Sequence, residues 1–363
     1  MTGFVPPPYP YERLDEIVAI ADEHDGGAVD LSIGTPCDPP PPAVLAELSA
    51  GQTARGYPPS IGTPAFREAA AHWISRRLGA TIDPATQLAA CVGTKEFVAS
   101  IPQYLQLRNP TRDTVLYPAI SYPTYEMGAI LAGCRAVPYL HLADIDGADA
   151  DRALCLWVNS PANPTGELHD LDEAAAWGRA RDIPVLSDEC YAEFSWAAPS
   201  TTILRSGSTG VLAVHSLSKR DNFAGARIGC YAGDADLVHY LREVRKHAGL
   251  MPAGPVQAAA VVALDDDDHV EAQRARYLAR MQRLVDVLDK LGYPAQLPAG
   301  AFYLWVAAPG GDAWAAARDL ARQIGIVVSP GEFYGTPGTA HFRVAAVQPE
   351  ARIELAANRI GAD

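Results

Sequence analysis

Short apolar runs alternate with longer amphipathic stretches along most of this chain, from about residue 64 to residue 260. Such alternation is typical of an α/β sheet in which crossover helices join buried strands. The runs that are short and rich in Val, Leu, Ile or Cys are predicted to be strands, at residues 88–92, 114–117, 153–158, 184–187, 211–215 and 227–232. The pattern therefore predicts an α/β fold with a mixed, mostly parallel sheet.

The C-terminal third has the pattern of a smaller α+β domain. Residues 270–291 repeat apolar side chains at helical spacing, which predicts a long helix with one buried stripe. Strands at 301–306, 326–329 and 341–345 and a helix at 313–324 are predicted to follow. Because 363 residues exceed the size at which single cores usually stop growing, we expect two domains. The expected limits are 47–262 for the large domain, 263–363 for the small domain, and 1–46 for an N-terminal segment packed on the small domain.

The composition argues against several classes of partner. A net charge of -14 and a pI near 5.0 disfavour nucleic acids and anionic membranes, which bind clustered Lys and Arg. The sequence has neither a run of about twenty apolar residues nor an N-terminal secretion signal, so we expect a cytoplasmic protein. Its cysteines lack metal-ligand spacing and no metal site is predicted, at Cys37, Cys91, Cys134, Cys155, Cys190 and Cys230.

Lys219, in the segment His215-Ser216-Leu217-Ser218-Lys219, is the leading candidate for a catalytic residue. The chain has only four lysines, Lys95, Lys219, Lys246 and Lys290. A lysine attacks a carbonyl group only after losing its proton, and a positive charge such as that of Arg227, if it lies close by, would lower the pKa of Lys219. Arg227, Ser216 and Ser218 could bind a phosphate dianion. A reactive lysine beside a phosphate clamp suits pyridoxal 5'-phosphate (PLP), although a solvated Lys and Arg in a loop also fits this segment alone.

Other polar motifs fall where predicted strands end, which is where open α/β sheets bind ligands. Gly93-Thr94-Lys95 lies between a strand and a helix, so its backbone N–H groups would bind an anion such as phosphate. Asp188 ends another strand and could pair with the ring nitrogen of the cofactor, and Tyr191 would reach the same ring. Asn163 lies in a proline-rich turn and can project inward. Taken singly, each motif also fits a structural role as a helix cap or a turn.

The order of these motifs resembles that of the class I/II aminotransferases of PLP fold type I. Gly-Thr is followed by the aromatic Tyr122, then by Asn-Pro-Thr-Gly, Asp-x-x-Tyr and Ser-x-Ser-Lys with Arg eight residues later, and finally by Arg343. The resemblance covers nearly the whole chain. It implies a large PLP-binding domain and a small α+β domain that begins with a long linking helix.

The resemblance also implies a role for each matching residue. Lys219, Asp188 and Tyr191 are the expected catalytic residues, with Lys219 forming a Schiff base with PLP. The expected cofactor-binding residues are Gly93, Thr94, Lys95, Tyr122, Asn163, Asp188, Tyr191, Ser216, Ser218, Lys219, Arg227 and Tyr57. Tyr57 is expected to reach the phosphate of the neighbouring subunit in a homodimer. The expected substrate-binding residues are Gly34, Asn163 and Arg343, of which Arg343 binds the α-carboxylate.

Three further segments, at 116–125, 244–252 and 330–335, make the chain most similar to N-succinyldiaminopimelate aminotransferases. This similarity implies exchange of an amino group between N-succinyl-LL-2,6-diaminopimelate and 2-oxoglutarate, with glutamate as the product, in lysine and diaminopimelate biosynthesis. Lys95, Arg245 and Lys246 would then either contact the remote carboxylates or, as we favour, lie on helix surfaces.

Three alternatives share parts of this pattern. Another class I/II aminotransferase, for aromatic, aspartate or LL-diaminopimelate substrates, would have the same catalytic residues and a different side-chain pocket. A PLP-dependent lyase on the same fold is a less favoured reading. A PLP-sensing regulator would need a DNA-binding domain before Gly34, where we expect none, because only 33 residues precede it and they contain no basic helix.

Overall fold

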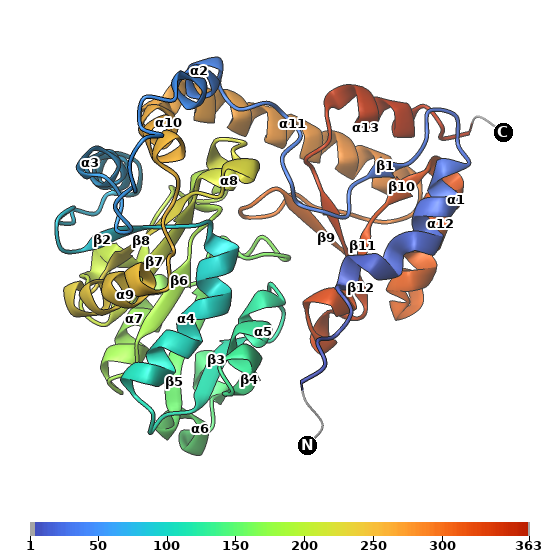
Figure 1. Cartoon of the computed structure of the whole chain (residues 1–363). Helices are drawn as coiled ribbons and strands as arrows, with labels where there is room; N and C mark the ends of the chain where they lie inside the picture. Colours follow the sequence, from blue (N-terminus) through green and yellow to red (C-terminus); the bar gives the residue numbers. More distant parts are fainter. Residues whose placement is uncertain (1–3, 362–363) are drawn as a thin grey trace. The chain divides into compact units, whose positions relative to one another are not determined.

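The computed structural model describes residues 4–361, which fall into two compact units. The large unit comprises Thr35–Arg276 and Pro298–Ala301. The small unit comprises the chain up to Gly34, Tyr277–Leu297, and the chain from Phe302 on. Each unit is built from segments distant in sequence, as the colours of Figure 1 show. The expected domain limits, at 46/47 and 262/263, remain predictions.

A seven-stranded sheet forms the centre of the large unit, in the order β2-β8-β7-β6-β5-β3-β4 (Figure 1). Its strands are β2 (Leu88–Cys91), β3 (Thr114–Pro118), β4 (Arg135–Tyr139), β5 (Ala153–Asn159), β6 (Val185–Asp188), β7 (Val211–Ser216) and β8 (Gly229–Gly233). Neighbouring strands from β7 to β4 are parallel, whereas β8 runs antiparallel to β7 and to β2. The predicted α/β class with a mixed, mostly parallel sheet is confirmed.

Helices pack around this sheet. They are α2 (Pro42–Ala50), α3 (Pro64–Trp73), α4 (Thr94–Arg108), α5 (Thr124–Leu131), α6 (Gly147–Asp151), α7 (Leu171–Arg179), α8 (Leu217–Arg220), α9 (Ala235–His247) and α10 (Gly254–Asp265). Of these, α4 to α7 connect successive strands from β2 to β6, because parallel neighbours need crossover connections. Successive strand residues point to opposite faces of the sheet. Val185 of β6 therefore packs in a layer with α3, α7 and α10, while Leu186 packs in a layer with α4, α5 and α9.

The small unit contains two sheets whose strands come from distant parts of the sequence. The strands are β1 (Val29–Asp30), β9 (Tyr303–Ala307), β10 (Ile326–Val327), β11 (Ser329–Pro330) and β12 (His341–Ala345). β1 pairs with β10 in parallel, and β12 lies between β11 and β9 with antiparallel pairing. The helices assigned to this unit are α1 (Asp15–Asp22), α12 (Ala313–Ile324) and α13 (Glu350–Ala357). The β1–β10 pairing ties the N-terminal segment to the C-terminal part of the chain.

The helix α11 (Asp267–Lys290) starts in the large unit and continues into the small one. Its predicted stripe is confirmed, since Tyr277, Met281, Leu284 and Leu288 are buried. One strand of the large sheet, β4, was not predicted. It has the sequence Arg-Ala-Val-Pro-Tyr and lies at a half-exposed edge, paired with β3, so it has no continuous apolar run. No helix within residues 4–361 has the length and apolar character needed to cross a membrane.

Candidate active site

Asp188 is the last residue of β6, and only 6% of it is exposed. The hydroxyl of Tyr125 donates a 2.8 Å hydrogen bond to Oδ2, and the backbone N–H of Cys190 donates a 3.2 Å hydrogen bond to Oδ1. Burial raises the pKa of Asp188, and the hydrogen bonds from Cys190 and Tyr125 and the charge of Lys219 oppose this rise. The carboxyl group is therefore held in one orientation, and a cationic partner would favour its ionised form.

Lys219 lies on α8, a single helical turn that follows β7 directly. Ser216 starts this turn, because its Oγ accepts a 3.2 Å hydrogen bond from the backbone N–H of Ser218. Both serines are buried, whereas Lys219 is half-buried. β7 lies beside β6 with Val214 opposite Asp188, so Lys219 and Asp188 extend from adjacent strand ends. The effect of the Lys219 charge on the pKa of Asp188 reflects this proximity.

A cradle for an anion lies at the start of α4. Gly93 precedes this helix with a φ of 77°, a left-handed conformation that favours glycine. A Cβ atom on Gly93 would lie 2.2 Å from Nη2 of Arg227, so the Arg227 guanidinium packs directly against the Gly93 backbone. Arg227 also donates a 2.9 Å hydrogen bond from Nη1 to the Ala224 carbonyl oxygen. The positive end of a 15-residue helix and a guanidinium thus face the same space, which suits phosphate.

The turn that carries Asn163 is tied to the end of β6. Asn159, the last residue of β5, donates a 2.8 Å hydrogen bond from Nδ2 to the backbone oxygen of Asp188. Its Oδ1 accepts a 2.7 Å hydrogen bond from the backbone N–H of Asn163. Asn163 and Tyr191 are both buried. The carboxyl ends of β5, β6 and β7 therefore present Asn163, Asp188, Tyr191 and Lys219, as the sequence motifs predicted.

Arg343 belongs to the small unit, where it lies on β12 with only 2% of its surface exposed. Its Nη2 donates hydrogen bonds to the Ser32 carbonyl oxygen at 2.5 Å and to the Tyr11 hydroxyl at 3.2 Å. Its guanidinium carbon lies 4.2 Å from the ring centre of Tyr303 and 4.7 Å from that of Tyr334. Burial raises the pKa of Tyr334, against the lowering effect of Arg343. The arginine is thus held in a cage of aromatic rings.

Gly34 also belongs to the small unit and contacts this cage. A Cβ atom on Gly34 would lie 2.0 Å from the Tyr303 hydroxyl oxygen and 2.8 Å from ring atom Cε1, so any larger residue would displace the ring. Gly34 and Arg343 therefore both pack against Tyr303. The small unit brings together the two predicted substrate-binding residues that it contains.

Tyr57, Lys95, Arg245 and Lys246 remain to be placed. Tyr57 is 96% exposed in the large unit, and Lys95 is exposed on the first turn of α4. The preferred interpretation of Arg245 as a helix-surface residue is wrong: it is buried, and it forms a 2.5 Å ion pair with Glu96. Lys246 does lie on the surface, 3.4 Å from Glu243. Arg245 is therefore a structural residue that fastens α9 to α4.

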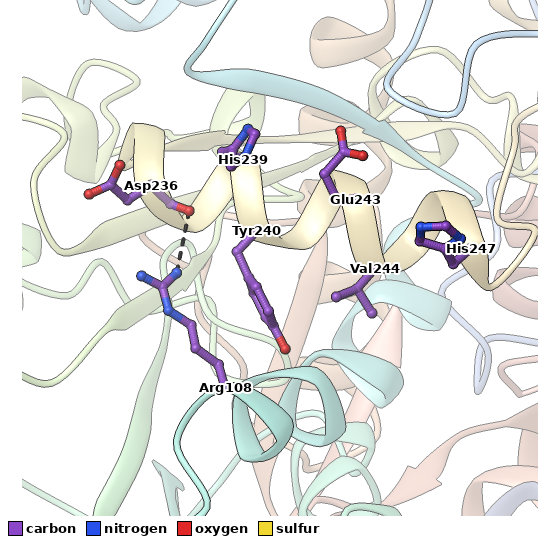
Figure 2. Close-up of a pocket in the computed structure, with 7 residues that line it drawn as sticks. All are labelled: Arg108, Asp236, His239, Tyr240, Glu243, Val244 and His247. Atoms are coloured by element: carbon purple, nitrogen blue, oxygen red, sulfur yellow. Dashed lines mark hydrogen bonds between the residues drawn. The ribbon is translucent and has the colours of Figure 1, made fainter.

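A surface pocket of about 520 Å³ lies on α9, and Figure 2 shows the side chains around it. They are Arg108, Asp236, His239, Tyr240, Glu243, Val244 and His247. Arg108 donates a 3.3 Å hydrogen bond to the Asp236 carbonyl oxygen and lies over the Tyr240 ring, 5.2 Å from its centre. None of the predicted site residues lines this pocket, and its arginine is engaged by protein groups. We assign it no catalytic role.

Two residues that shape the site were not assigned from sequence, Tyr125 and Asn159. Tyr125 is fully buried, its ring stacks on Trp157 at 5.0 Å, and its hydroxyl binds Asp188. It lies three residues after Tyr122, whose ring it meets edge-on at 6.0 Å. The aromatic segment Tyr122-Pro123-Thr124-Tyr125, which begins with a residue already assigned to the cofactor, was the available signal. Asn159 gave no comparable signal, because its bond to the end of β6 joins residues that are distant in sequence.

A family model described as aminotransferase class I and II matches residues 27–360. The chain belongs to this family. The transaminase OxyQ of Streptomyces rimosus, named for 4-dedimethylamino-4-oxo-anhydrotetracycline, is 42% identical over 98% of this chain and 99% of its own length. An LL-diaminopimelate aminotransferase of Aquifex aeolicus is 33% identical over 98% of this chain and 96% of its own length.

Solved structures of the same fold support this membership. An aminotransferase from Neisseria meningitidis superposes with a TM-score of 0.89 at 30% identity, covering 97% of both chains. A probable N-succinyldiaminopimelate aminotransferase from Thermus thermophilus gives a TM-score of 0.85 at 28% identity, covering 96% of this chain and 98% of that one. This aminotransferase therefore has PLP fold type I.

The family depends on PLP, and the large unit has groups that fit this cofactor. The start of α4 and the Arg227 guanidinium packed against Gly93 together offer positive charge that suits its phosphate. The buried carboxyl group of Asp188 suits a protonated ring nitrogen. The Lys219 amine, on the adjacent strand end, suits its aldehyde.

Proposed function

We propose that this aminotransferase uses Lys219, Asp188 and Tyr191 as catalytic residues. One observation carries the proposal: a buried carboxyl group ends β6, and a lysine follows the adjacent strand β7, close enough for its charge to act on that carboxyl group. Fully buried acids are uncommon unless a charge partner is supplied. A protonated ring nitrogen would be that partner.

Each catalytic side chain has a defined task in this proposal. When bound, PLP supplies an aldehyde that joins the substrate amine and a ring that accepts the electron pair left at Cα. Lys219 would hold the aldehyde at rest; once the substrate amine displaces it, the freed amine would move the Cα proton to the former aldehyde carbon, an acid–base role on the order of 100- to 10,000-fold in rate. Asp188 holds a proton on the ring nitrogen. Asn163 and Tyr191 hydrogen-bond the ring hydroxyl group.

The remaining cofactor contacts are positioning contacts in the proposal. Tyr122 stacks on the ring, and the phosphate is bound by Gly93, Thr94, Lys95, Ser216, Ser218 and Arg227. The backbone N–H groups at the start of α4 and the Arg227 guanidinium supply the positive charge that balances the phosphate.

We propose that Arg343 binds the α-carboxylate of both substrates, with Gly34 and Asn163 lining the substrate. A guanidinium forms two parallel hydrogen bonds to a carboxylate, which an ammonium group cannot do. The aromatic cage and the Ser32 carbonyl oxygen hold Arg343 in one orientation, so little side-chain entropy is lost when the carboxylate binds.

As its substrates we propose N-succinyl-LL-2,6-diaminopimelate and 2-oxoglutarate, exchanged reversibly. The motifs at 116–125, 244–252 and 330–335 support this choice, and so does the likeness to the Thermus thermophilus structure. The Aquifex aeolicus relative supports LL-diaminopimelate as the main alternative. Both choices place the enzyme in lysine and diaminopimelate biosynthesis. Its cytoplasmic location stays a prediction.

A second candidate is favoured by the 42% identity to OxyQ, whose name specifies a 4-oxo-anhydrotetracycline. In that case the amino acceptor would be a ketone on a ring system. Arg343 would then serve only the amino-acid half-reaction, because that ketone has no adjacent carboxylate.

We also propose a homodimer in which Tyr57 contacts the PLP phosphate of the partner. Tyr57 is 96% exposed, and Gly56 beside it has no atom within 4 Å of an added Cβ. An aromatic residue that is so exposed is a natural interface contact.

Substrate choice is tested by comparing kcat/KM for a panel of amino donors with 2-oxoglutarate. N-succinyl-LL-2,6-diaminopimelate should exceed LL-diaminopimelate, phenylalanine, tyrosine and aspartate. An advantage of roughly tenfold for another donor, about 1.4 kcal/mol in the transition state, would reject the succinylated substrate. Efficient amination of a 4-oxo-anhydrotetracycline with no activity on diaminopimelates would establish the second candidate. Identifying the product as an oxo acid or an eliminated fragment separates transaminase from lyase.

A further inference from the structure

Two glutamates of the large unit, Glu189 and Glu193, are buried to 1% and 3% exposure but have different partners. Glu193 lies 2.9 Å from Arg77 and 3.3 Å from Arg220, so it forms buried ion pairs. Glu189 instead faces His215, whose Nε2 lies 3.6 Å from Oε2 of the glutamate. The two acids therefore need different charge states.

Of the two carboxyl oxygens of Glu189, Oε1 is bonded elsewhere and Oε2 faces His215. Oε1 accepts hydrogen bonds of 2.8 Å from the hydroxyl of Ser187 and from the backbone N–H of Ile203. Within residues 4–361, Oε2 and the two imidazole nitrogens have no partner in hydrogen-bond geometry, although the Thr202 hydroxyl acts on the pKa of Glu189 and the Glu189 backbone on that of His215. The 3.6 Å separation exceeds a hydrogen bond by only a few tenths of an ångström. A single proton between Oε2 and Nε2 would satisfy both atoms.

Apolar packing and distant charges complete the surroundings of the pair. The groups that face it are the Trp73 indole on α3, the Cys230 thiol on β8, the Thr202 hydroxyl, and the carboxyl groups of Asp188 and Glu193. The Trp73 ring meets His215 edge-on at 4.9 Å. No arginine or lysine within residues 4–361 forms an ion pair with Glu189, whereas Glu193 has two.

The neutral state of the pair is favoured by this environment. Burial raises the pKa of Glu189 to about 7 and lowers that of His215 to about 4, the latter against a raising effect of the Glu189 backbone. Two buried neutral groups that share a hydrogen bond avoid the desolvation cost of a buried ion pair. Between about pH 4 and pH 7 these pKa values favour a protonated Glu189 beside a neutral His215.

Each member of the pair adjoins a residue assigned to the cofactor. Glu189 directly follows Asp188 at the end of β6, and His215 directly precedes Ser216 at the end of β7. The backbone N–H of Glu189 also donates a 2.9 Å hydrogen bond to the Val214 carbonyl oxygen. A side-chain bond between Glu189 and His215 would fix the two strand ends relative to each other.

We propose that Glu189 and His215 share one proton, and that this neutral pair positions Asp188 and Ser216 for the cofactor. Its positioning role rests on the cofactor contacts proposed above for Asp188 and Ser216. The shared proton itself rests only on the contacts of the pair. The two parts are therefore tested separately.

The proton is tested in the apoenzyme with Glu189→Gln and the matched control Glu193→Gln. A glutamine at 189 keeps a donor toward His215, so we expect its urea unfolding midpoint at pH 5 to lie close to that of the wild type. The control should unfold at clearly lower urea, because Arg77 and Arg220 lose their anion. The infrared difference spectrum between wild type and Glu189→Gln should contain the band of a protonated carboxyl group. A carboxylate band there instead, or equal destabilisation by both changes, would overturn the shared proton.

The pH dependence gives a second check with a defined sign. Because the folded pKa of Glu189 is raised above 4.5 to about 7, its stabilisation is complete below pH 4.5 and is lost as the pH rises through 7. The urea unfolding midpoint of the wild type should therefore fall relative to that of Glu189→Gln between pH 5 and pH 8. A constant difference over this range would contradict the proposal.

Positioning is tested in the PLP-bound enzyme with Glu189→Leu, His215→Leu and the double variant. Each single change should weaken PLP binding on the order of tenfold and shift the pH midpoint of the cofactor's visible absorbance, and the double variant should show little further loss. Additive losses, or an unchanged absorbance midpoint in folded variants, would overturn the positioning role. The shared proton would stand if its own tests succeed, and failure of PLP to bind the wild type would instead reject the proposed function.

Discussion

At the scale of single residues, Asp188 is buried, whereas its proposed role requires it to carry a negative charge. Burial raises its pKa above the ordinary value of 3.8, against the hydrogen bonds from Cys190 and Tyr125. The folded apoenzyme therefore binds a proton at Asp188 more tightly than the unfolded chain does. A protonated ring nitrogen would reverse this preference, since an opposite charge favours the ionised carboxyl group.

Changing Asp188 to Asn should reveal how much a buried, ionised carboxyl group destabilises the folded apoenzyme. The neutral form stabilises the folded apoenzyme fully below pH 3.8, and that contribution is lost as the pH rises through the raised pKa. The free energy of unfolding of the wild type minus that of Asp188→Asn should therefore fall between pH 4 and pH 8. Urea unfolding of both apoproteins measures it. A difference that rises with pH would mean that Asp188 is better stabilised as an anion than its contacts indicate.

Arg343 allows a test of substrate binding with a control in the same unit. Arg343→Lys should reduce kcat/KM in both half-reactions, because a buried carboxylate loses one of two parallel hydrogen bonds, at roughly 2 to 5 kcal/mol, or about 30-fold or more. Arg283→Lys removes a similar geometry at an exposed ion pair, 2.6 Å from Glu354, and should leave kcat/KM unchanged. Loss in only the amino-acid half-reaction would favour the ketone substrate of the second candidate.

At the scale of elements, strands buried on both faces were predictable because their residues are apolar without interruption. β5 and β7 are examples, with every residue buried. β4 was missed because an edge strand has one hydrogen-bonded neighbour and tolerates Arg and Pro. β1 is two residues long, and its partner β10 lies almost three hundred residues away, so no local pattern could indicate the pairing.

The site residues were predictable to the extent that each lies in a local motif. Lys219, Asp188 and Asn163 follow strands, and the order of the strands in a parallel sheet brings their carboxyl ends to one edge. The hydrogen bond from Tyr125 to Asp188 depends on how α5 is rotated against the sheet. That rotation follows from packing with Trp157 across the core, which a single sequence does not reveal.

The start of α4 gives a prediction at this scale. Gly93→Ala should weaken PLP binding by roughly tenfold, because it strains a residue with φ of 77° and displaces the Arg227 guanidinium. Gly133 has a φ of 70° with open space around it. Gly133→Ala should therefore add only the backbone strain, roughly 1 to 2 kcal/mol in unfolding free energy, and leave PLP affinity unchanged. Titration of the apoenzymes with PLP compares them. Equal PLP affinity in both variants would reject phosphate binding at the start of α4.

At the scale of the whole molecule, the proposed cofactor residues belong to the large unit, and the proposed dimer adds Tyr57 from a second subunit. Lys219 and Asp188 belong to the large unit, while Gly34 and Arg343 belong to the small one. If Tyr57 is shared as proposed, activity would be a property of the dimer.

Mixed dimers test this sharing. Tyr57→Phe should impair PLP binding, and Lys219→Ala should abolish turnover. A heterodimer of the two variants contains one site with an intact Lys219 and an intact Tyr57 from opposite subunits, so part of the activity should return. Activity of purified heterodimers carrying two different affinity tags measures the rescue. Heterodimers as inactive as the parent variants would show that Tyr57 serves its own subunit or none.

The most direct test of the central claim is the identity of the lysine that binds PLP. The PLP-loaded protein should have a visible absorbance band that borohydride abolishes, and peptide mapping should then place the reduced adduct on Lys219. The chain offers only three other lysines, Lys95, Lys246 and Lys290, so the assignment is unambiguous. An adduct on Lys95 or another of these three, or no visible band after reconstitution with PLP, would contradict the account.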